Sequence, residues 1–224
     1  FRALSQEGLC RFVFCGERQL HGALHNPDSP LFNFCNILRL SYLQPQHALR
    51  IIQEPMAEMG VMFEDAEALP AGIIELSGCH PNLVQAICQM LIVRMNTRGD
   101  RMIRMGDLAQ VRASDEFRDF FFEVTWGNAT TLERLITVLM VNRASFALAD
   151  VAHALSGHAC SISKARIEDA LTSLDLFSLL RKQGNRYSFA SRSFSAIMIE
   201  SSLVETFRDG SLEKLKAEER QTLS

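Results

Sequence analysis

A long amphipathic run in the middle of the sequence constrains the fold most. Between Pro81 and Asn96, apolar residues recur at intervals of three and four, which is the period of an α-helix with one buried side. The broad apolar face of this helix consists of Leu83, Val84, Ile87, Cys88, Leu91, Ile92 and Met95. A face of this width has to be covered by other helices. The segment therefore predicts a helical bundle.

Two helical segments precede this run. The first begins near Pro45, and Pro55 is expected to kink or end it. Its apolar face is predicted to consist of Ala48, Ile51, Ile52, Pro55 and Met59. The second runs from Asp65 to Leu76 with an interruption at Pro70. With a short extended piece at 102–105 and a short helix at 106–112, these segments complete the predicted bundle.

The second half of the chain has a different order of elements. An aromatic-rich helix is predicted for 115–126, and three further helices and two short strands follow it. The helices are predicted at 131–141, 147–155 and 163–174, and the strands at 179–182 and 186–189. Three helices followed by a two-stranded hairpin is the order of a winged-helix domain. From Ser191 a long helix is expected to run toward a solvated or frayed tail at 212–220.

The first 43 residues suggest a piece of an α/β structure. A helix is predicted for 1–6, a buried strand for Arg11 to Cys15, and a short helix from Glu17. A loop with two prolines follows, and then a second strand at 37–40. The predicted fold class is therefore mainly α with minor β.

Composition narrows the class of protein. The 224 residues carry 23 basic and 26 acidic side chains, a net charge of −3, so no global charge favours a polyanionic partner. No apolar run approaches the roughly 20 residues that span a bilayer. The six cysteines have irregular spacings that fit neither a zinc site nor a disulfide framework. We expect free thiols and a cytoplasmic protein without a metal site.

Catalytic patterns are missing from the sequence. A P-loop needs a Gly-Lys pair, because the lysine and the backbone amides surround the phosphates, and the chain has none. No nucleophile and base stand out at a useful spacing, so a free-standing enzyme is the least favoured alternative. We expect no catalytic residue and no ATP hydrolysis by this chain alone.

Two short motifs carry the functional signal. Phe12-Val-Phe-Cys-Gly-Glu-Arg18 is a strand pattern followed by an arginine, which would lie at the carboxyl edge of a sheet, where ligands of α/β proteins bind. Leu76-Ser-Gly-Cys-His-Pro-Asn-Leu-Val-Gln85 is a helix-to-helix corner, with Gly78 ending one helix and Pro81 opening the next. Without further context, Arg18 is a solvated arginine and His80 a capping or partly buried imidazole.

With these motifs in this order, the chain resembles the carboxyl-terminal half of an AAA+-like ATPase of the STAND type, close to bacterial and archaeal AAA-ATPase families related to origin-recognition initiators. The resemblance covers roughly Leu4 to Ile199. The first motif is similar to the sensor-1 strand, and the second is similar to the lid corner, which usually reads Gly-Gly-His-Pro. Here Cys79 replaces the second glycine.

The resemblance implies four domains: the end of a P-loop ATPase core at 1–43, a helical lid at 44–113, a winged helix at 114–200, and a C-terminal helix or tail at 201–224. It implies that Arg18 faces the γ-phosphate and that Gly78, His80 and Pro81 approach the nucleotide. ATP or ADP and Mg²⁺ are implied for the intact protein, with none bound to this chain alone. The P-loop would belong to a missing N-terminal segment, and a protein partner or self-oligomer is implied.

A DNA-binding winged-helix protein with a structural or dimerising N-terminal domain is the alternative. Its contacts would be Lys164 and Arg166 on the helix that would enter the groove, and Arg181, Lys182 and Arg186 around the hairpin. The helix also carries three acidic residues, Glu168, Asp169 and Asp175. Such a face is poorly suited to phosphate contacts.

Overall fold

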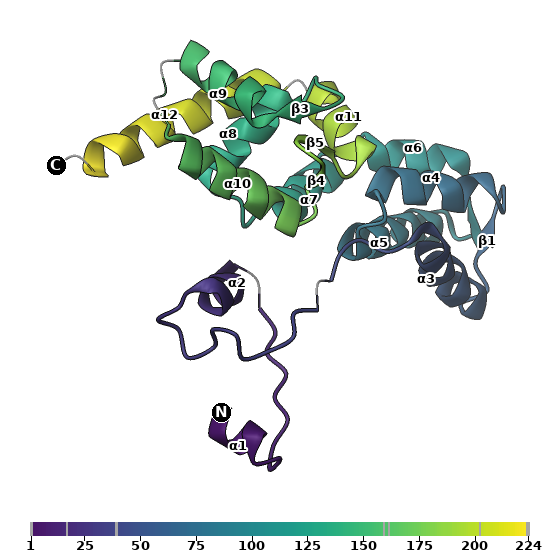
Figure 1. The fold of residues 1–224 in the computed structure, drawn as a ribbon. Helices are drawn as coiled ribbons and strands as arrows, with labels where there is room; N and C mark the ends of the chain where they lie inside the picture. Colours follow the sequence, from purple (N-terminus) through teal and green to yellow (C-terminus); the bar gives the residue numbers. More distant parts are fainter. Residues whose placement is uncertain are drawn as a thin grey trace. The chain divides into compact units, whose positions relative to one another are not determined.

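The computed structural model describes residues 2–16, 18–38, 40–158, 160, 162–201 and 203–222. It divides the chain into two compact units, Phe1–Leu40 and Ser41–Ser224. The described residues are mainly helical, with short strands (Figure 1), which confirms the mainly α class with minor β. The finer predicted domain boundaries stay predictions.

The first unit contains two short helices, α1 (Arg2–Gln6) and α2 (Arg18–His25). The predicted strand at 11–15 is wrong, because these residues have no regular structure and the Val13 side chain is 89% exposed. The predicted strand at 37–40 is also wrong over its described residues, and Leu38 is 85% exposed. A strand is stabilised by hydrogen bonds to a neighbouring strand, and within the described residues neither segment belongs to a sheet.

Four helices and a small parallel sheet form the first part of the second unit. The helices are α3 (Pro45–Glu58), α4 (Ala68–Ser77), α5 (Pro81–Arg98) and α6 (Met105–Arg112). The strands β1 (Met62–Phe63) and β2 (Met102–Ile103) pair with Met62 opposite Met102. Ile52, Ile73 and Ile87 are fully buried where α3, α4 and α5 meet. This apolar layer holds the bundle together.

The two internal prolines have less effect than the sequence predicted. Helix α3 continues three residues beyond Pro55, to Glu58. Pro55 is exposed, so the carbonyl that loses its amide partner can bond to water. Pro70 is the third residue of α4, where backbone amides have no intrahelical acceptor, and it interrupts nothing.

The buried side of α3 also differs from the predicted face. Ala48, Ile52 and Met56 are buried, at intervals of four residues. Ile51 and Met59, which were predicted on the buried face, are 38% and 45% exposed. The helix is therefore rotated relative to the prediction, because Met56 packs into the core and Pro55 does not.

The rest of the second unit combines helices with a three-stranded sheet. Its helices are α7 (Asp115–Trp126), α8 (Thr131–Met140), α9 (Leu148–Gly157), α10 (Lys164–Leu176), α11 (Arg192–Glu200) and α12 (Val204–Thr222). Its strands are β3 (Phe146–Ala147), β4 (Leu180–Gln183) and β5 (Arg186–Phe189). They pair antiparallel in the order β3-β5-β4. Strand β3 has only two residues and was not predicted.

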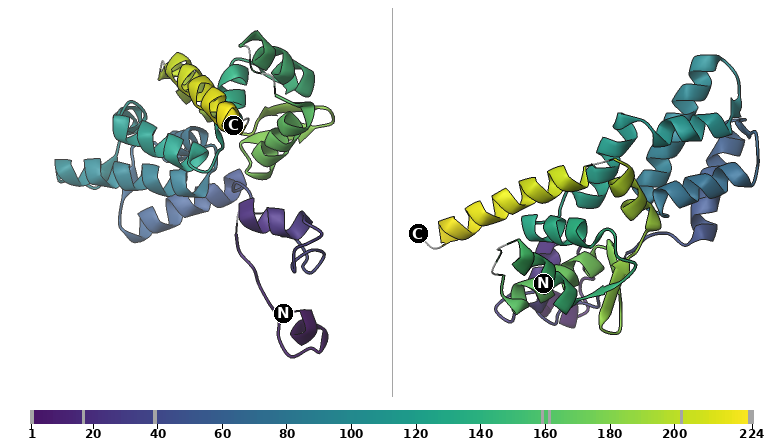
Figure 2. Two further views of the ribbon diagram at one scale, coloured as in Figure 1. Left: turned by 90° about the vertical axis from the view of Figure 1, so that its left-hand side faces the viewer. Right: turned by 90° about the horizontal axis from the view of Figure 1, so that it is seen from above.

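The C-terminal segment is a packed helix over most of its length. The prediction of one long helix from Ser191 leading to a solvated tail is wrong, since α11 ends at Glu200 and α12 covers 212–220. Leu215 is fully buried and Leu212 is nearly so, and α12 packs on α8. Thr131 Oγ1 is 2.7 Å from Glu218 Oε1. Figure 2 shows the C-terminal end of α12 projecting beyond the helices on which it packs.

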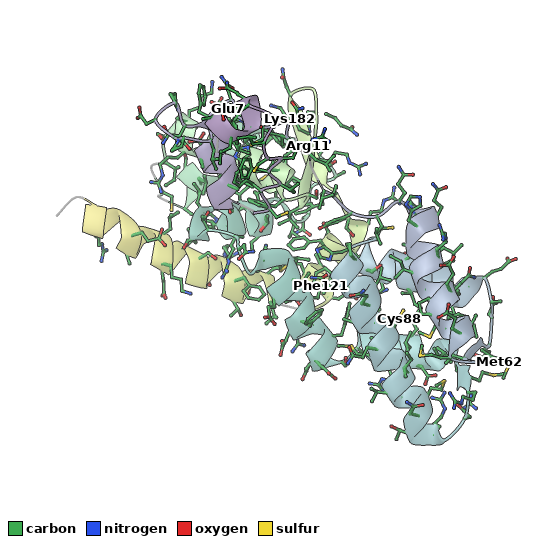
Figure 3. All side chains as sticks on the ribbon, turned by 90° about the horizontal axis from the view of Figure 1, so that it is seen from below. Glu7, Arg11, Met62, Cys88, Phe121 and Lys182 are labelled. Atoms are coloured by element: carbon green, nitrogen blue, oxygen red, sulfur yellow. The ribbon has the colours of Figure 1, made fainter. Side chains whose placement is uncertain are left out.

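An aromatic cluster joins α7, α11 and α12. The Trp126 ring lies 5.6, 5.8 and 4.9 Å, between centroids, from Phe122, Phe194 and Phe207 respectively. Phe121, labelled in Figure 3, lies 6.2 Å from Phe194 in the same cluster. These edge and tilted contacts bury large rings from three helices. None of the helices in the described residues has both the length and the apolar character needed to cross a membrane.

Candidate functional site

The corner between α4 and α5 has the backbone form that its sequence requires. Gly78 ends α4 in the left-handed region (φ 57°, ψ 28°), and its N–H bonds to Glu75 O at 3.3 Å. Glycine adopts this conformation without steric cost. Pro81 is the first residue of α5, where a missing N–H costs nothing. The sequence thus predicts this corner correctly, and the structure brings Gly78, His80 and Pro81 together there.

Cys79 is the unusual residue of the corner. Its φ of 63° repeats the left-handed conformation of Gly78, although it carries a side chain. Its carbonyl accepts the N–H of Leu43 at 3.0 Å, which ties the segment before α3 to the corner. Burial raises the pKa of the Cys79 thiol, which favours its protonated form.

His80 occupies the N-cap position of α5 but makes no capping bond with its side chain. Its ring lies edge-on to Tyr42, with 5.0 Å between centroids. Burial lowers the pKa of His80 below its usual value and raises that of Tyr42 to about 12. Nδ1 of His80 is buried and has no hydrogen-bond partner among the described residues. The imidazole is therefore neutral at pH 7 and keeps one polar atom unused.

The corner also contacts the helix that follows the β4–β5 hairpin. Ser193 Oγ donates to the carbonyl of Glu75, the last turn of α4. A Cβ on Gly78 would come within 2.6 Å of Ser191 Cβ, so only glycine permits this approach. Arg112 on α6 forms an exposed ion pair of 2.6 Å with Glu200 at the end of α11. Through these contacts the corner and the hairpin are parts of one compact unit.

Arg18, the predicted γ-phosphate contact, belongs to the first unit. Its backbone begins α2, and its side chain lies outside the described part of the chain. The predicted role of Arg18 depended on a strand at 11–15 that would end at the edge of a sheet. Residues 11–15 do not form this strand. The role of Arg18 stays a prediction.

The basic residues proposed for DNA contact differ in their surroundings. Lys164 lies 3.7 Å from Glu168, one turn along α10. Arg186 donates to Ser145 Oγ and Ser145 O at 2.9 and 2.8 Å, so its guanidinium supports the sheet. Lys182 Nζ lies 5.6 Å from the centre of the Tyr187 ring.

The two remaining basic residues, Arg166 and Arg181, are exposed, and neither has an ion pair within the described ranges. Two of these five basic residues lie on α10 and three on the hairpin, and α10 packs against β4.

The sequence did not predict two groups of residues that lie at the corner or at the end of α5. Tyr42, Ser191 and Ser193 join the corner from positions distant in the chain, and no local pattern marks them. Arg94 and Arg98 are four residues apart on α5, a spacing that places both on one side of a helix. That spacing is the one signal that could have drawn attention to the end of α5.

No protein-family model matches the chain, and a search of curated proteins finds no significant match. Within the described residues, no group of three or more His, Cys, Asp or Glu side chains is placed to hold a metal ion.

Proposed function

We propose that this chain is the C-terminal regulatory part of a nucleotide-dependent switch of the AAA+/STAND type. The observation that carries the proposal is the corner at 78–81, which has the left-handed glycine, the histidine and the helix-opening proline in the expected order. The elements α8, β3, α9, α10, β4 and β5, with the sheet order β3-β5-β4, support the winged-helix assignment of the second half.

The nucleotide would be held mainly by a P-loop part, which supplies the lysine that this chain lacks. Gly78, His80 and Pro81 would close over it from the lid, and Arg18 would contact the γ-phosphate. The unused Nδ1 of His80 fits such a role, because a buried polar atom without a partner is costly unless a ligand or water satisfies it. The carboxylate ligands of Mg²⁺ would come from the P-loop part.

The signal would pass from the corner to the winged helix through direct contacts. A shift of Gly78 or Glu75 would displace Ser191 and Ser193, which lie at the start of α11 and contact these two residues. Since α11 follows β5 directly, the hairpin would move with it. Nucleotide binding would thus bias the unit between two arrangements. The output would be contact with a protein partner or with further copies of the chain.

The test uses the protein together with its P-loop part. Arg18→Ala should weaken the ATP-dependent change, measured as protection of the lid from limited proteolysis, and leave the apo pattern unchanged. His80→Ala should do the same, and Arg50→Ala, an exposed arginine on α3 paired with Glu54, serves as the matched control. An unchanged ATP response in both variants would remove these residues from the mechanism. A protein whose proteolysis does not depend on nucleotide would end the proposal.

DNA binding is the second candidate, favoured by the exposed Arg181 and Lys182 on the hairpin. Its test is the salt dependence of duplex binding. If the hairpin contacts phosphates, log K should fall with log salt, and Arg181→Ala should reduce the slope by about one. A slope near zero favours protein contacts.

A further inference from the structure

A cleft of about 470 Å³ opens between the end of α5 and the beginning of α6. Arginines dominate its polar lining: Arg94 and Arg98 from α5, and Arg104, which precedes α6. Gly106, Asp107 and Gln110 line the α6 side. The cleft lies far from the corner, since Arg94 follows Pro81 by thirteen residues, or about 20 Å along the helix axis.

The acidic groups at the cleft are already satisfied. Asp107 is almost fully buried, and its two oxygens accept from Arg98 Nη1 and from the backbone N–H of Arg104, the latter at 2.8 Å. Asp100, beside the cleft, accepts from Arg98 Nε at 3.4 Å and from Arg104 Nη2 at 2.7 Å. These bonds lower the repulsion that an entering anion would meet.

Arg94 keeps its charge uncompensated. Its Nη1 donates to the neutral Gln110 Oε1 at 2.7 Å, and no carboxylate of the described residues lies within 4.0 Å of it. The Arg104 side chain is 47% exposed, and of its guanidinium nitrogens only Nη2 is bonded to a described residue. Two guanidinium groups therefore present unused donors to the cleft.

The backbone adds to this positive character. Gly106 lies in the first turn of α6, and a Cβ there would meet no atom within 4 Å, so the space beside its backbone is open. The first turn of a helix carries the positive end of the helix dipole. At α6 the Met105 N–H already donates to Glu64 Oε2 at 2.9 Å and the Asp107 N–H to Arg104 O at 3.0 Å. Arg94 supplies a full charge next to this turn, and Arg104 supplies a guanidinium group that is paired with Asp100.

We propose that this cleft binds a phosphate group of a small molecule. A phosphate has three acceptor oxygens and close to two negative charges, which match the guanidinium groups of Arg94 and Arg104. Arg98 serves as a positioning residue, since it is bonded to Asp107, Asp100 and Met102 O and holds α5 against the start of α6. The site is separate from the proposed nucleotide corner and does not depend on it.

The test measures binding to the whole 224-residue chain by titration calorimetry at constant ionic strength. Inorganic phosphate and glycerol 3-phosphate are the two probes, which distinguish a free phosphate from a phosphate ester. Arg94→Gln and Arg104→Gln remove the two unused donors. Arg50→Gln removes the same charge from α3 in the same unit and is the matched control. Far-UV circular dichroism establishes that each variant is folded.

We expect millimolar or tighter binding of at least one probe, weakened about tenfold or more in Arg94→Gln and in Arg104→Gln. Arg50→Gln should bind like the original chain. Tighter binding of glycerol 3-phosphate would assign the site to a phosphate ester, and tighter binding of inorganic phosphate would assign it to the free anion. No binding of either probe, or equal losses in all three variants, would overturn the proposal. Should Arg94→Gln fail to fold, the exposed Arg104→Gln decides.

Discussion

Gly78 packs directly against Ser191, 113 residues later in the sequence: a Cβ built on Gly78 would lie 2.6 Å from Ser191 Cβ. Two structural requirements therefore favour glycine at this position. It adopts a left-handed backbone at the end of α4, and it lets the start of α11 approach. A local signal in the sequence explains the first requirement, and only the fold explains the second.

Gly78→Ala should therefore lower the free energy of unfolding by about 2–4 kcal/mol, since a left-handed alanine and an overpacked contact each cost about 1–2 kcal/mol. Urea unfolding measures this loss. Gly99 has the same backbone sign (φ 73°) but open space around it, so Gly99→Ala isolates the backbone cost. Equal losses in the two variants would contradict the close contact with Ser191.

Cys79 should tolerate glycine better than a β-branched residue. Because its φ is 63°, Cys79→Gly relieves backbone strain and should leave the free energy of unfolding unchanged or higher. Cys79→Val keeps a side chain of similar size and should lower it by about 1–2 kcal/mol. The comparison is made by thermal and urea unfolding. A valine variant as stable as the glycine variant would argue against the left-handed backbone at residue 79.

His80 should make stability depend on pH. Burial lowers the pKa of His80 in the folded state below the usual 6.5, so the unfolded chain binds more protons in this range. The free energy of unfolding should rise with pH through this window and fall as the pH drops below about 6.5. His80→Phe keeps an aromatic ring beside Tyr42 and should flatten the dependence. His153→Phe, which changes an exposed histidine on α9, should not. A slope unaffected by His80→Phe would contradict the burial.

Helix α12 should contribute to global stability. Leu215 is fully buried against the rest of the unit, so Leu215→Ala should cost about 2–4 kcal/mol. The exposed Ile199 on α11 is the control, and Ile199→Ala should change stability by no more than about 0.5 kcal/mol. Similar small effects for both variants in chemical denaturation would mean that α12 is solvated, as the sequence alone suggested.

Trp126 offers a spectroscopic test of the core. Its buried indole Nε1–H donates to Thr137 Oγ1 at 3.1 Å. Thr137→Val removes the acceptor and should cost about 1–3 kcal/mol while shifting the indole emission to shorter wavelength. Thr137→Ser keeps the hydroxyl and should leave the emission unchanged. The chain has one tryptophan, so the emission reports this site alone.

Much of the second unit could be read from local patterns. Thr130 and Glu133 form a capping box at the start of α8, with bonds of 2.8 and 3.3 Å, and Ser114 caps α7. Such signals act within one turn, so the helix at 115–126 and the strand at 186–189 were predicted to the residue. The tight turn at 183–185 fixed the hairpin in the same way.

The candidate site was only half predictable. Gly78 and Pro81 predict the corner by residue type, because a left-handed backbone favours glycine and the first position of a helix accepts proline. Tyr42 and Ser191 reach the same corner from distant segments, and nothing near them in the sequence marks the contact. The arginines of the α5–α6 cleft had the same disadvantage, since Arg104 joins Arg94 and Arg98 only after the chain turns through β2.

The sequence by itself determined which segments become the helices α3 to α10 and where the α4–α5 corner turns. These outcomes depend on apolar periodicity, caps, glycine and proline, all of which act over a few residues. The tertiary structure alone decided that 11–15 is no strand, that α3 passes through Pro55, and that α12 packs on α8. A strand needs a partner and a helix face needs a covering surface, and both come from residues far away in the chain.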